Sequence, residues 1–135
     1  MLNKAQGLVQ HLNAKFRVAR SRYDEFRIYD LGSMALNKLT PRKGYMVLDN
    51  IAYGLKSRHR LDIYKSNTPR SQQPLIVFVH GGAWSRGDKS DYRFVGEAFA
   101  KEGFDVAVVN YQLAPEHIFP EYVDDLSLAL DYLDT

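Results

Sequence analysis

The chain has 135 residues, which suits one ordinary domain, and its 45% apolar and 13% aromatic content can build a core, which excludes intrinsic disorder. It contains no cysteine, so disulfides, a thiol nucleophile and thiolate metal sites are excluded. The net charge is +2, but residues 1–70 carry 14 basic and 5 acidic side chains while residues 71–135 carry 4 and 11, so the halves have opposite charge.

Residues 1–43 are predicted to form an amphipathic helical arm. Apolar side chains recur there at steps of three and four residues, at Ala5, Leu8, Leu12, Phe16, Ala19, Tyr23 and Phe26. Gly32 is expected to end this helix, and a second short helix is expected over residues 33–39. The basic residues are scattered, so nucleic acid is not expected as a partner. We expect the arm to pack onto the globular part; contact with a membrane surface through its apolar face is the alternative.

The chain shows no sign of membrane insertion or secretion. No apolar run approaches the roughly 18 residues of a spanning helix, and the first residues lack the apolar core of a secretory signal. The absence of cysteine also fits a reducing compartment. We therefore expect a soluble, cytoplasmic protein.

The periodicity changes at residue 44, where β-rich segments begin. Residues 45–53 and 60–64 are separated by a polar, glycine-containing segment, which predicts an antiparallel hairpin of two edge strands. The unbroken apolar run at residues 75–79 predicts a parallel strand that is covered on both faces.

Helices and strands then alternate. Apolar residues on one face of residues 94–100 predict a helix that ends near Gly103, and residues 104–110 form a second apolar strand. A further helix is predicted to begin near Pro120. This order indicates an α/β fold, with a β-hairpin and two parallel strands joined by crossover helices.

The strand at residues 75–79 runs directly into a turn with the sequence His80-Gly81-Gly82. The two glycines allow the backbone to approach a substrate closely. Backbone amides that follow the strand can point at a carbonyl oxygen as it becomes negative. The segment therefore predicts an oxyanion hole, which is half of an acyl-transfer site.

Residues 44–134 resemble the amino-terminal half of an α/β-hydrolase, in the esterase and lipase branch related to hormone-sensitive lipase and kynurenine formamidase. Two sequence blocks carry the resemblance and follow consecutive strands. The first is His80-Gly-Gly-Ala-Trp84 followed by Gly87-Asp88-Lys89, and the second is Asn110-Tyr-Gln-Leu-Ala-Pro-Glu-His117 with Phe119-Pro120 and Asp125. The resemblance divides the chain into the arm, residues 1–43, and a partial α/β-hydrolase domain, residues 44–135.

The resemblance also implies roles for the first block. The backbone amides of Gly81, Gly82 and Ala83 are expected to bind the developing oxyanion. His80 is expected to support this loop and not to act as the catalytic base, because the family's catalytic histidine lies near the carboxyl terminus.

Two further side chains of the block are expected to assist. Trp84 is expected to shape the adjoining pocket wall. Asp88 is expected to hold the following loop through hydrogen bonds to backbone amides, with simple turn or helix capping as the alternative. The second block is expected to be structural.

The nucleophile, acid and base of a serine hydrolase are not expected within this chain. No serine lies in Gly-x-Ser-x-Gly, the strand-to-helix turn that exposes the nucleophile, and this elbow is expected after residue 135. A substitute triad built from Ser85 or Ser90 with His80 or His117 is disfavoured, because neighbours on one loop do not supply the geometry. The four histidines are dispersed, so no metal site is predicted.

We therefore expect the amino-terminal portion of a serine carboxylic-ester hydrolase of the EC 3.1.1 type, which acts on a small ester or amide and needs no cofactor. The alternative is a non-catalytic remnant, or an interaction module that uses the basic arm and an open sheet edge. In the family's strand order the strand at residues 75–79 is interior, so the chain alone is expected to leave its edge unpaired and to self-associate or aggregate.

Overall fold

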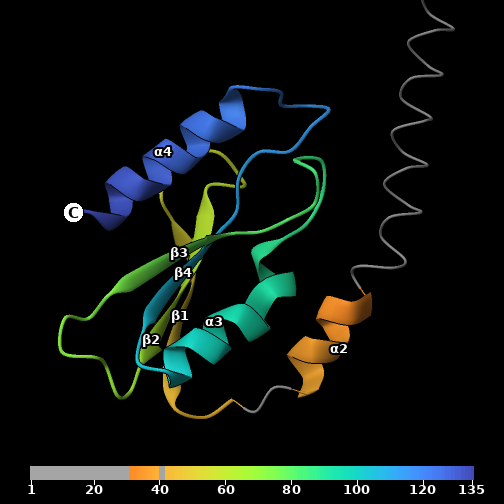
Figure 1. Cartoon of the computed structure of the whole chain (residues 1–135). Helices are drawn as coiled ribbons and strands as arrows, with labels where there is room; N and C mark the ends of the chain where they lie inside the picture. The colour runs from red at the N-terminus through yellow and green to blue at the C-terminus, as the bar shows by residue number, and fades with distance from the viewer. Residues whose placement is uncertain (1–30, 40–41) are drawn as a thin grey trace, which may run out of the picture. The chain divides into compact units, whose positions relative to one another are not determined.

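The structure, a computed structural model, describes residues 31–39 and 42–135 (Figure 1). The amphipathic helix expected before residue 31 lies outside the described residues. The short helix expected over residues 33–39 is present as α2, Leu31–Leu39. Gly32 lies inside α2, which corrects its predicted role as a helix end, since an isolated glycine weakens a helix without ending it.

The central element is a mixed four-stranded sheet with the strand order β1-β2-β4-β3. Strands β1, Tyr45–Ala52, and β2, Arg60–Ser66, form the predicted antiparallel hairpin. Strand β3, Leu75–Val79, pairs in parallel with β4, Asp105–Val109, as predicted. However, β2 is not an edge strand, because its second side pairs antiparallel with β4.

Two helices cover opposite faces of the sheet (Figure 1). The short 3-10 helix η2, Lys89–Tyr92, leads into α3, Arg93–Lys101, which ends just before Gly103 as predicted. Helix α4, Glu121–Leu133, begins directly after Pro120 and covers the other face. The result is a three-layered α/β arrangement in which the connection from β3 to β4 runs through a helix.

Alternation along β4 divides the core between the two faces. Val106 and Val108 pack with Ala100 on the α3 side, whereas Val109 packs with Ala129 on the α4 side. Successive side chains of a strand point to opposite faces, so a strand that is buried on both faces must be apolar throughout. The sequence pattern of β4 meets this requirement.

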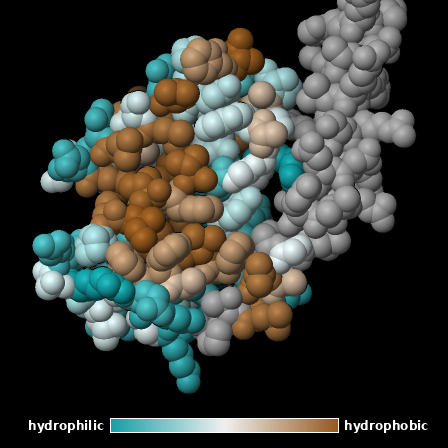
Figure 2. All heavy atoms as spheres, in the orientation of Figure 1, coloured by the Kyte–Doolittle hydropathy of each residue, from teal (hydrophilic) through white to brown (hydrophobic). Residues whose placement is uncertain are grey.

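Strand β3 differs from the prediction that it is covered on both faces. Its end residues Leu75 and Val79 are 42% and 37% exposed, because β4 is its only hydrogen-bonded neighbour in the described sheet. Figure 2 shows a broad apolar surface on this side of the molecule. Exposed apolar side chains on β3 and its flanking helices include Leu75, Val79, Phe99, Val123, Leu128 and Leu130.

We expect a lysine on β3 to reduce self-association of the 135-residue chain. An unpaired apolar edge strand is a template for pairing with another chain, and a charge on that edge opposes such pairing. The variant is Leu75→Lys, and sedimentation velocity measures the fraction of monomer. Leu55→Lys is the matched control, because Leu55 is fully exposed in the β1–β2 connection, away from the β3 edge. An equal rise in monomer for both variants would contradict a specific role of the edge.

Within the ranges that the structure describes, no helix is long and apolar enough to cross a membrane.

Candidate functional site

His80 follows the last residue of β3 and is the buried support of the glycine turn. Its ring stacks on Tyr111, with ring centroids 4.5 Å apart, and lies nearly parallel to Tyr92 at 5.9 Å. Its Nδ1 lies 2.8 Å from the carbonyl oxygen of Gly81, and the Tyr111 hydroxyl donates to the His80 carbonyl at 2.8 Å. The ring is therefore held against the loop by these contacts, and its role as support of an oxyanion hole stays a prediction.

The loop after His80 has a backbone that requires glycine at one position. Gly82 has a φ of 130°, and a Cβ placed there would lie 2.1 Å from the carbonyl oxygen of Arg86. That carbonyl lies so close because the loop turns tightly, with the amides of Ser85 and Arg86 both donating to the Gly82 carbonyl. Gly82 therefore has no substitute that preserves this turn.

The three predicted oxyanion donors, the amides of residues 81–83, lie on this turn. Ala83 continues the left-handed path with a φ of 52° and is exposed, as is its neighbour Trp84. Among the described residues, no hydrogen-bond acceptor is assigned to the amides of Gly82 and Ala83. Consecutive unpaired amides on an exposed turn are a suitable site for a negatively charged oxygen. Gly81 lies at the base of the turn, with its carbonyl facing His80.

Arg58 joins the hairpin connection to this loop. Its Nε donates to the Tyr111 carbonyl at 2.7 Å, and its Nη2 donates to the Gly87 carbonyl at 2.9 Å. Nη2 also lies 3.5 Å from His80 Nε2, and Nη1 lies 3.6 Å from a carboxylate oxygen of Asp88. One guanidinium thus contacts both ends of the loop and Tyr111, the second residue after β4.

Asp88 holds the end of the loop. One carboxylate oxygen accepts from the Ser90 amide at 2.9 Å and from the Ser90 hydroxyl at 2.8 Å. The other accepts from Asn110 Nδ2 at 2.7 Å. Asp88 is also the N-cap of η2, so both expectations for this residue, a loop fastener and a helix cap, describe its contacts. Burial alone would raise the pKa of Asp88, but the hydrogen bonds from Ser90 and Asn110, with the Arg58 charge, outweigh it and lower that pKa.

Trp84 forms one side of an aromatic group beside the loop. Its ring stacks on Tyr122 of α4 with centroids 4.6 Å apart, and it contacts Tyr111 at 5.2 Å. The Trp84 carbonyl accepts from the Ala114 amide at 2.8 Å, which ties the two sequence blocks together. The indole remains 42% exposed, and its role as a pocket wall stays a prediction.

The second sequence block is largely structural in its contacts. Asp125 is buried and accepts from the Gln112 amide at 2.8 Å, while its other oxygen lies 2.7 Å from His59 Nε2. His117 pairs with Glu121 one helical turn away, with 2.6 Å between ring nitrogen and carboxylate. These contacts fasten α4 to β2 and to the loop after β4.

Sequence reasoning assigned no role to Arg58 or Tyr111, and it treated Asn110 only as part of a block. Asn110 receives the Lys89 amide on its Oδ1 at 2.7 Å while it donates to Asp88. The only signal for Asn110 was its position immediately after an apolar strand. No sequence pattern indicated a role for Arg58, because the residues that it contacts lie far away along the chain.

The described residues contain no cluster of three or more His, Asp or Glu side chains that could hold a metal ion.

We expect the free energy of unfolding to fall below about pH 6.5, the ordinary pKa of histidine. Burial lowers the pKa of His80, more than its hydrogen bond to Gly81 raises it, and the Arg58 charge lowers it further. As the pH decreases, the His80 ring is therefore protonated in the unfolded chain before it is protonated in the folded chain. This favours the unfolded chain, so the free energy of unfolding decreases. Urea unfolding at about pH 7.5 and about pH 5.5 measures this loss, which should be smaller in His80→Asn. An unchanged pH dependence in that variant would rule out His80 as the cause.

Comparisons with known proteins identify the family of this chain. The BD-FAE family model matches residues 61–135, which is more than half of the chain. A kynurenine formamidase of Drosophila melanogaster is 33% identical over 101 residues, covering 72% of this chain and 33% of that protein. A probable isoprenylcysteine alpha-carbonyl methylesterase of Oryza sativa is 33% identical over 87 residues, covering 64% of this chain and 21% of that protein.

Solved structures show the same fold. A bacterial heroin esterase superposes with a TM-score of 0.65 and 30% identity, covering 78% of this chain and 34% of that chain. Esterase B from Lactobacillus rhamnosis superposes with a TM-score of 0.77 over 90% of this chain and 40% of that chain; at 18% identity, this match supports the fold alone. The chain spans a third or less of the length of the kynurenine formamidase and of the methylesterase. The chain belongs to the BD-FAE family, in the esterase branch of the α/β-hydrolases.

Proposed function

We propose that this chain supplies the oxyanion-binding part of a serine carboxylic-ester hydrolase that acts on a small ester or amide. The observation that carries the proposal is the pair of amides at Gly82 and Ala83, which have no assigned acceptor among the described residues and lie on a loop that buried side chains hold in place. The esterase and formamidase names of the relatives support the same class of reaction.

The proposed chemistry is acyl transfer. A serine oxygen attacks the substrate carbonyl carbon, and the carbonyl oxygen becomes negative as the tetrahedral intermediate forms. The amides of Gly82 and Ala83 would donate to that oxygen, and a single such donor contributes about 10²–10³ in rate. The leaving alcohol or amine then departs with a proton, and water hydrolyses the acyl-enzyme. No cofactor is required for these steps.

The site also accounts for why His80 would not serve as the base. A general base needs a nitrogen that can take the serine proton and return it. His80 Nδ1 faces the Gly81 carbonyl and its Nε2 faces the Arg58 guanidinium, at 2.8 and 3.5 Å respectively. The serine, acid and base would come from outside the two sequence blocks described here, and residues 1–43 would form an accessory arm to the domain at residues 44–135.

The test is made on the natural product, captured from its source cells with an antibody to residues 1–40. Intact mass and hydrolysis of a short p-nitrophenyl ester are measured on the same sample, with and without a serine-directed phosphonate. Turnover that the phosphonate abolishes, in a species heavier than the 15.5 kDa of these 135 residues, supports the proposal. Absence of turnover in every species that contains residues 1–135 would refute it and favour a non-catalytic interaction module.

A further inference from the structure

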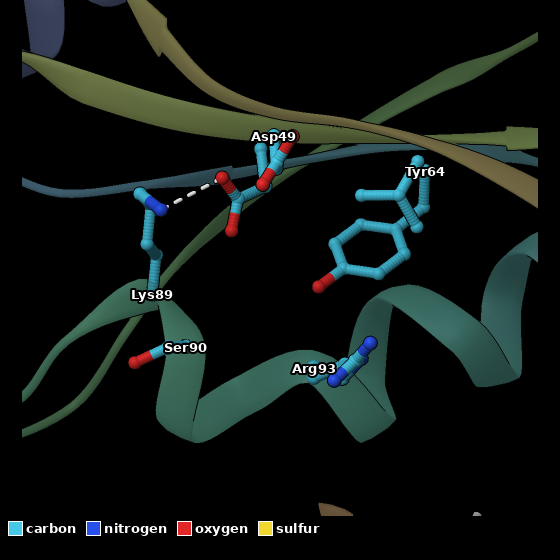
Figure 3. A pocket seen from close by; sticks show the side chains of 7 residues that line it. Asp49, Tyr64, Lys89, Ser90 and Arg93 are labelled. Carbon is cyan, nitrogen blue, oxygen red and sulfur yellow. Dashed lines mark ion pairs between the residues drawn. The ribbon is translucent and has the colours of Figure 1, made fainter. Parts of the chain in front are cut away.

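A cavity lies between the sheet and the η2–α3 segment, and the proposed acyl-transfer chemistry does not use it (Figure 3). Its volume is about 420 Å³, which is within the usual range for small-molecule sites. Strands β1 and β2 provide Asp49, Asp62 and Tyr64, while η2 and α3 provide Lys89 and Arg93. None of these side chains belongs to the Gly82–Ala83 turn.

The two walls of this cavity carry opposite charges. The sheet side carries carboxylates, and the η2–α3 side carries an ammonium and a guanidinium, as Figure 3 shows for Asp49, Lys89 and Arg93. Lys89 is buried with its Nζ 2.7 Å from Asp62, and a single ion pair leaves two of the three ammonium protons for a ligand. Arg93 contacts buried Glu97 through Nε at 3.2 Å, so its other nitrogens hold further donors.

Tyr64 supplies a hydrogen-bond donor to the cavity. The residue is only 2% exposed, yet no hydrogen-bond partner for its hydroxyl is assigned within the described part of the chain. Figure 3 shows this hydroxyl directed into the cavity. Burial and the nearby Asp62 charge raise the pKa of the phenol, so the hydroxyl stays protonated and can donate. An oxygen atom of a ligand in the cavity could accept a hydrogen bond from this hydroxyl.

Asp49 provides the opposite charge. Its side chain lies on the β1 wall, in an exposed residue, and it has no ion-pair partner among the residues that the structure describes. The acidic lining residues balance the basic ones, and buried Glu97 adds a further negative charge behind Arg93. A multiply charged anion is therefore disfavoured here, whereas a ligand with one charge of each sign matches both walls.

We propose that this cavity binds a small zwitterion of the α-amino acid class. The ligand carboxylate accepts hydrogen bonds from Tyr64, Lys89 and Arg93, and the ligand ammonium faces the Asp49 carboxylate. The aromatic ring of Tyr64 and the side chain of Val47 offer apolar contact to the rest of the ligand.

The test uses three probes that differ only in their charges: L-phenylalanine, 3-phenylpropionate, which lacks the ammonium, and 2-phenylethylamine, which lacks the carboxylate. Saturation-transfer NMR on the 135-residue chain measures each dissociation constant. This measurement detects the ligand, so self-association of the protein does not prevent it. We expect L-phenylalanine to bind at least tenfold more tightly than either singly charged probe. Equal binding of all three, or no saturable binding of L-phenylalanine, overturns the proposal.

Two variants assign the binding to this cavity. Tyr64→Phe removes only the hydroxyl and should weaken L-phenylalanine about tenfold, the effect of losing one hydrogen bond to a charged group. Asp49→Asn should remove the preference for L-phenylalanine over 3-phenylpropionate. Asp131→Asn, an exposed carboxylate on α4, is the matched control and should bind as the unchanged protein does. Unchanged binding in Asp49→Asn, which lies at an exposed position and leaves the core intact, would also refute the proposal.

Discussion

We expect Gly82→Ala to abolish the oxyanion-binding turn and to have the largest functional effect of any single methyl group added to the chain. The φ of 130° is unfavourable for alanine, and the new Cβ would lie 2.1 Å from the Arg86 carbonyl oxygen, so the backbone must move. The displaced amides would no longer converge on one oxygen. In the complete hydrolase we expect kcat to fall by about 10²–10³, the effect of one lost oxyanion donor.

The same substitution should reduce stability by about 1–3 kcal/mol, the usual cost of a residue held in an unfavourable backbone conformation. Urea unfolding of the 135-residue chain measures this quantity without any need for turnover. Gly32→Ala is the matched control, because a Cβ there meets no atom within 4 Å and Gly32 lies in helix α2. In this control we expect a small gain, about 0.5–1 kcal/mol, from the better helix propensity of alanine. Full activity of Gly82→Ala in the complete enzyme would refute the assignment of this turn.

We expect Arg58→Met to loosen the loop and to destabilise the fold by about 3 kcal/mol, since hydrogen bonds from a charged group each contribute about 1.5–3 kcal/mol. The change removes the donors to the Tyr111 and Gly87 carbonyls at 2.7 and 2.9 Å, and it leaves those carbonyls without their charged partner. Methionine keeps the length of the side chain, so the loss reports mainly on the guanidinium. Urea unfolding again measures the stability.

A second readout separates a positioning role from general loss of packing. The Arg58 charge lowers the pKa of His80, so its removal should raise that pKa toward the ordinary value, as NMR titration of the His80 ring can follow. Lys65→Met is the matched control, because the Lys65 ammonium makes only a long 3.9 Å contact with Asp105 at the surface. This control should change stability by less than about 0.5 kcal/mol and leave the His80 titration unchanged. An unaltered His80 titration in Arg58→Met would show that Arg58 does not act on this ring.

The structure shows a loop held by three parts of the fold. The hairpin connection contributes Arg58, the end of β4 contributes Asn110 and Tyr111, and the start of η2 contributes Asp88. These groups contact carbonyls and a side chain of the loop, and in the described part of the chain the amides of Gly82 and Ala83 have no assigned acceptor. Such preorganisation is what transition-state stabilisation requires, because donors already in place need not reorganise as charge develops.

The sequence alone determined the elements and the identity of the turn. The apolar run of β4 and the His80-Gly81-Gly82 turn are local patterns, and the physical constraint behind each acts within a few residues. A strand buried on both faces must be apolar at every position, and a backbone that approaches a neighbouring carbonyl must lack a Cβ. The hairpin, the parallel pairing of β3 with β4, and the tight glycine turn at Gly82 could therefore be predicted.

Only the tertiary structure decided which strand lies at the edge and which side chains hold the turn. The sequence patterns of β3 and β4 both predict strands that are buried on both faces, yet β3 is partly exposed. The burial of a strand depends on its neighbours, and the strand order decides which neighbours it has. Arg58 reaches the loop across 29 residues of sequence to Gly87, and Tyr111 reaches His80 across 31. No periodicity encodes such contacts; they arise when β2 pairs with β4 and brings the hairpin connection beside the end of β3.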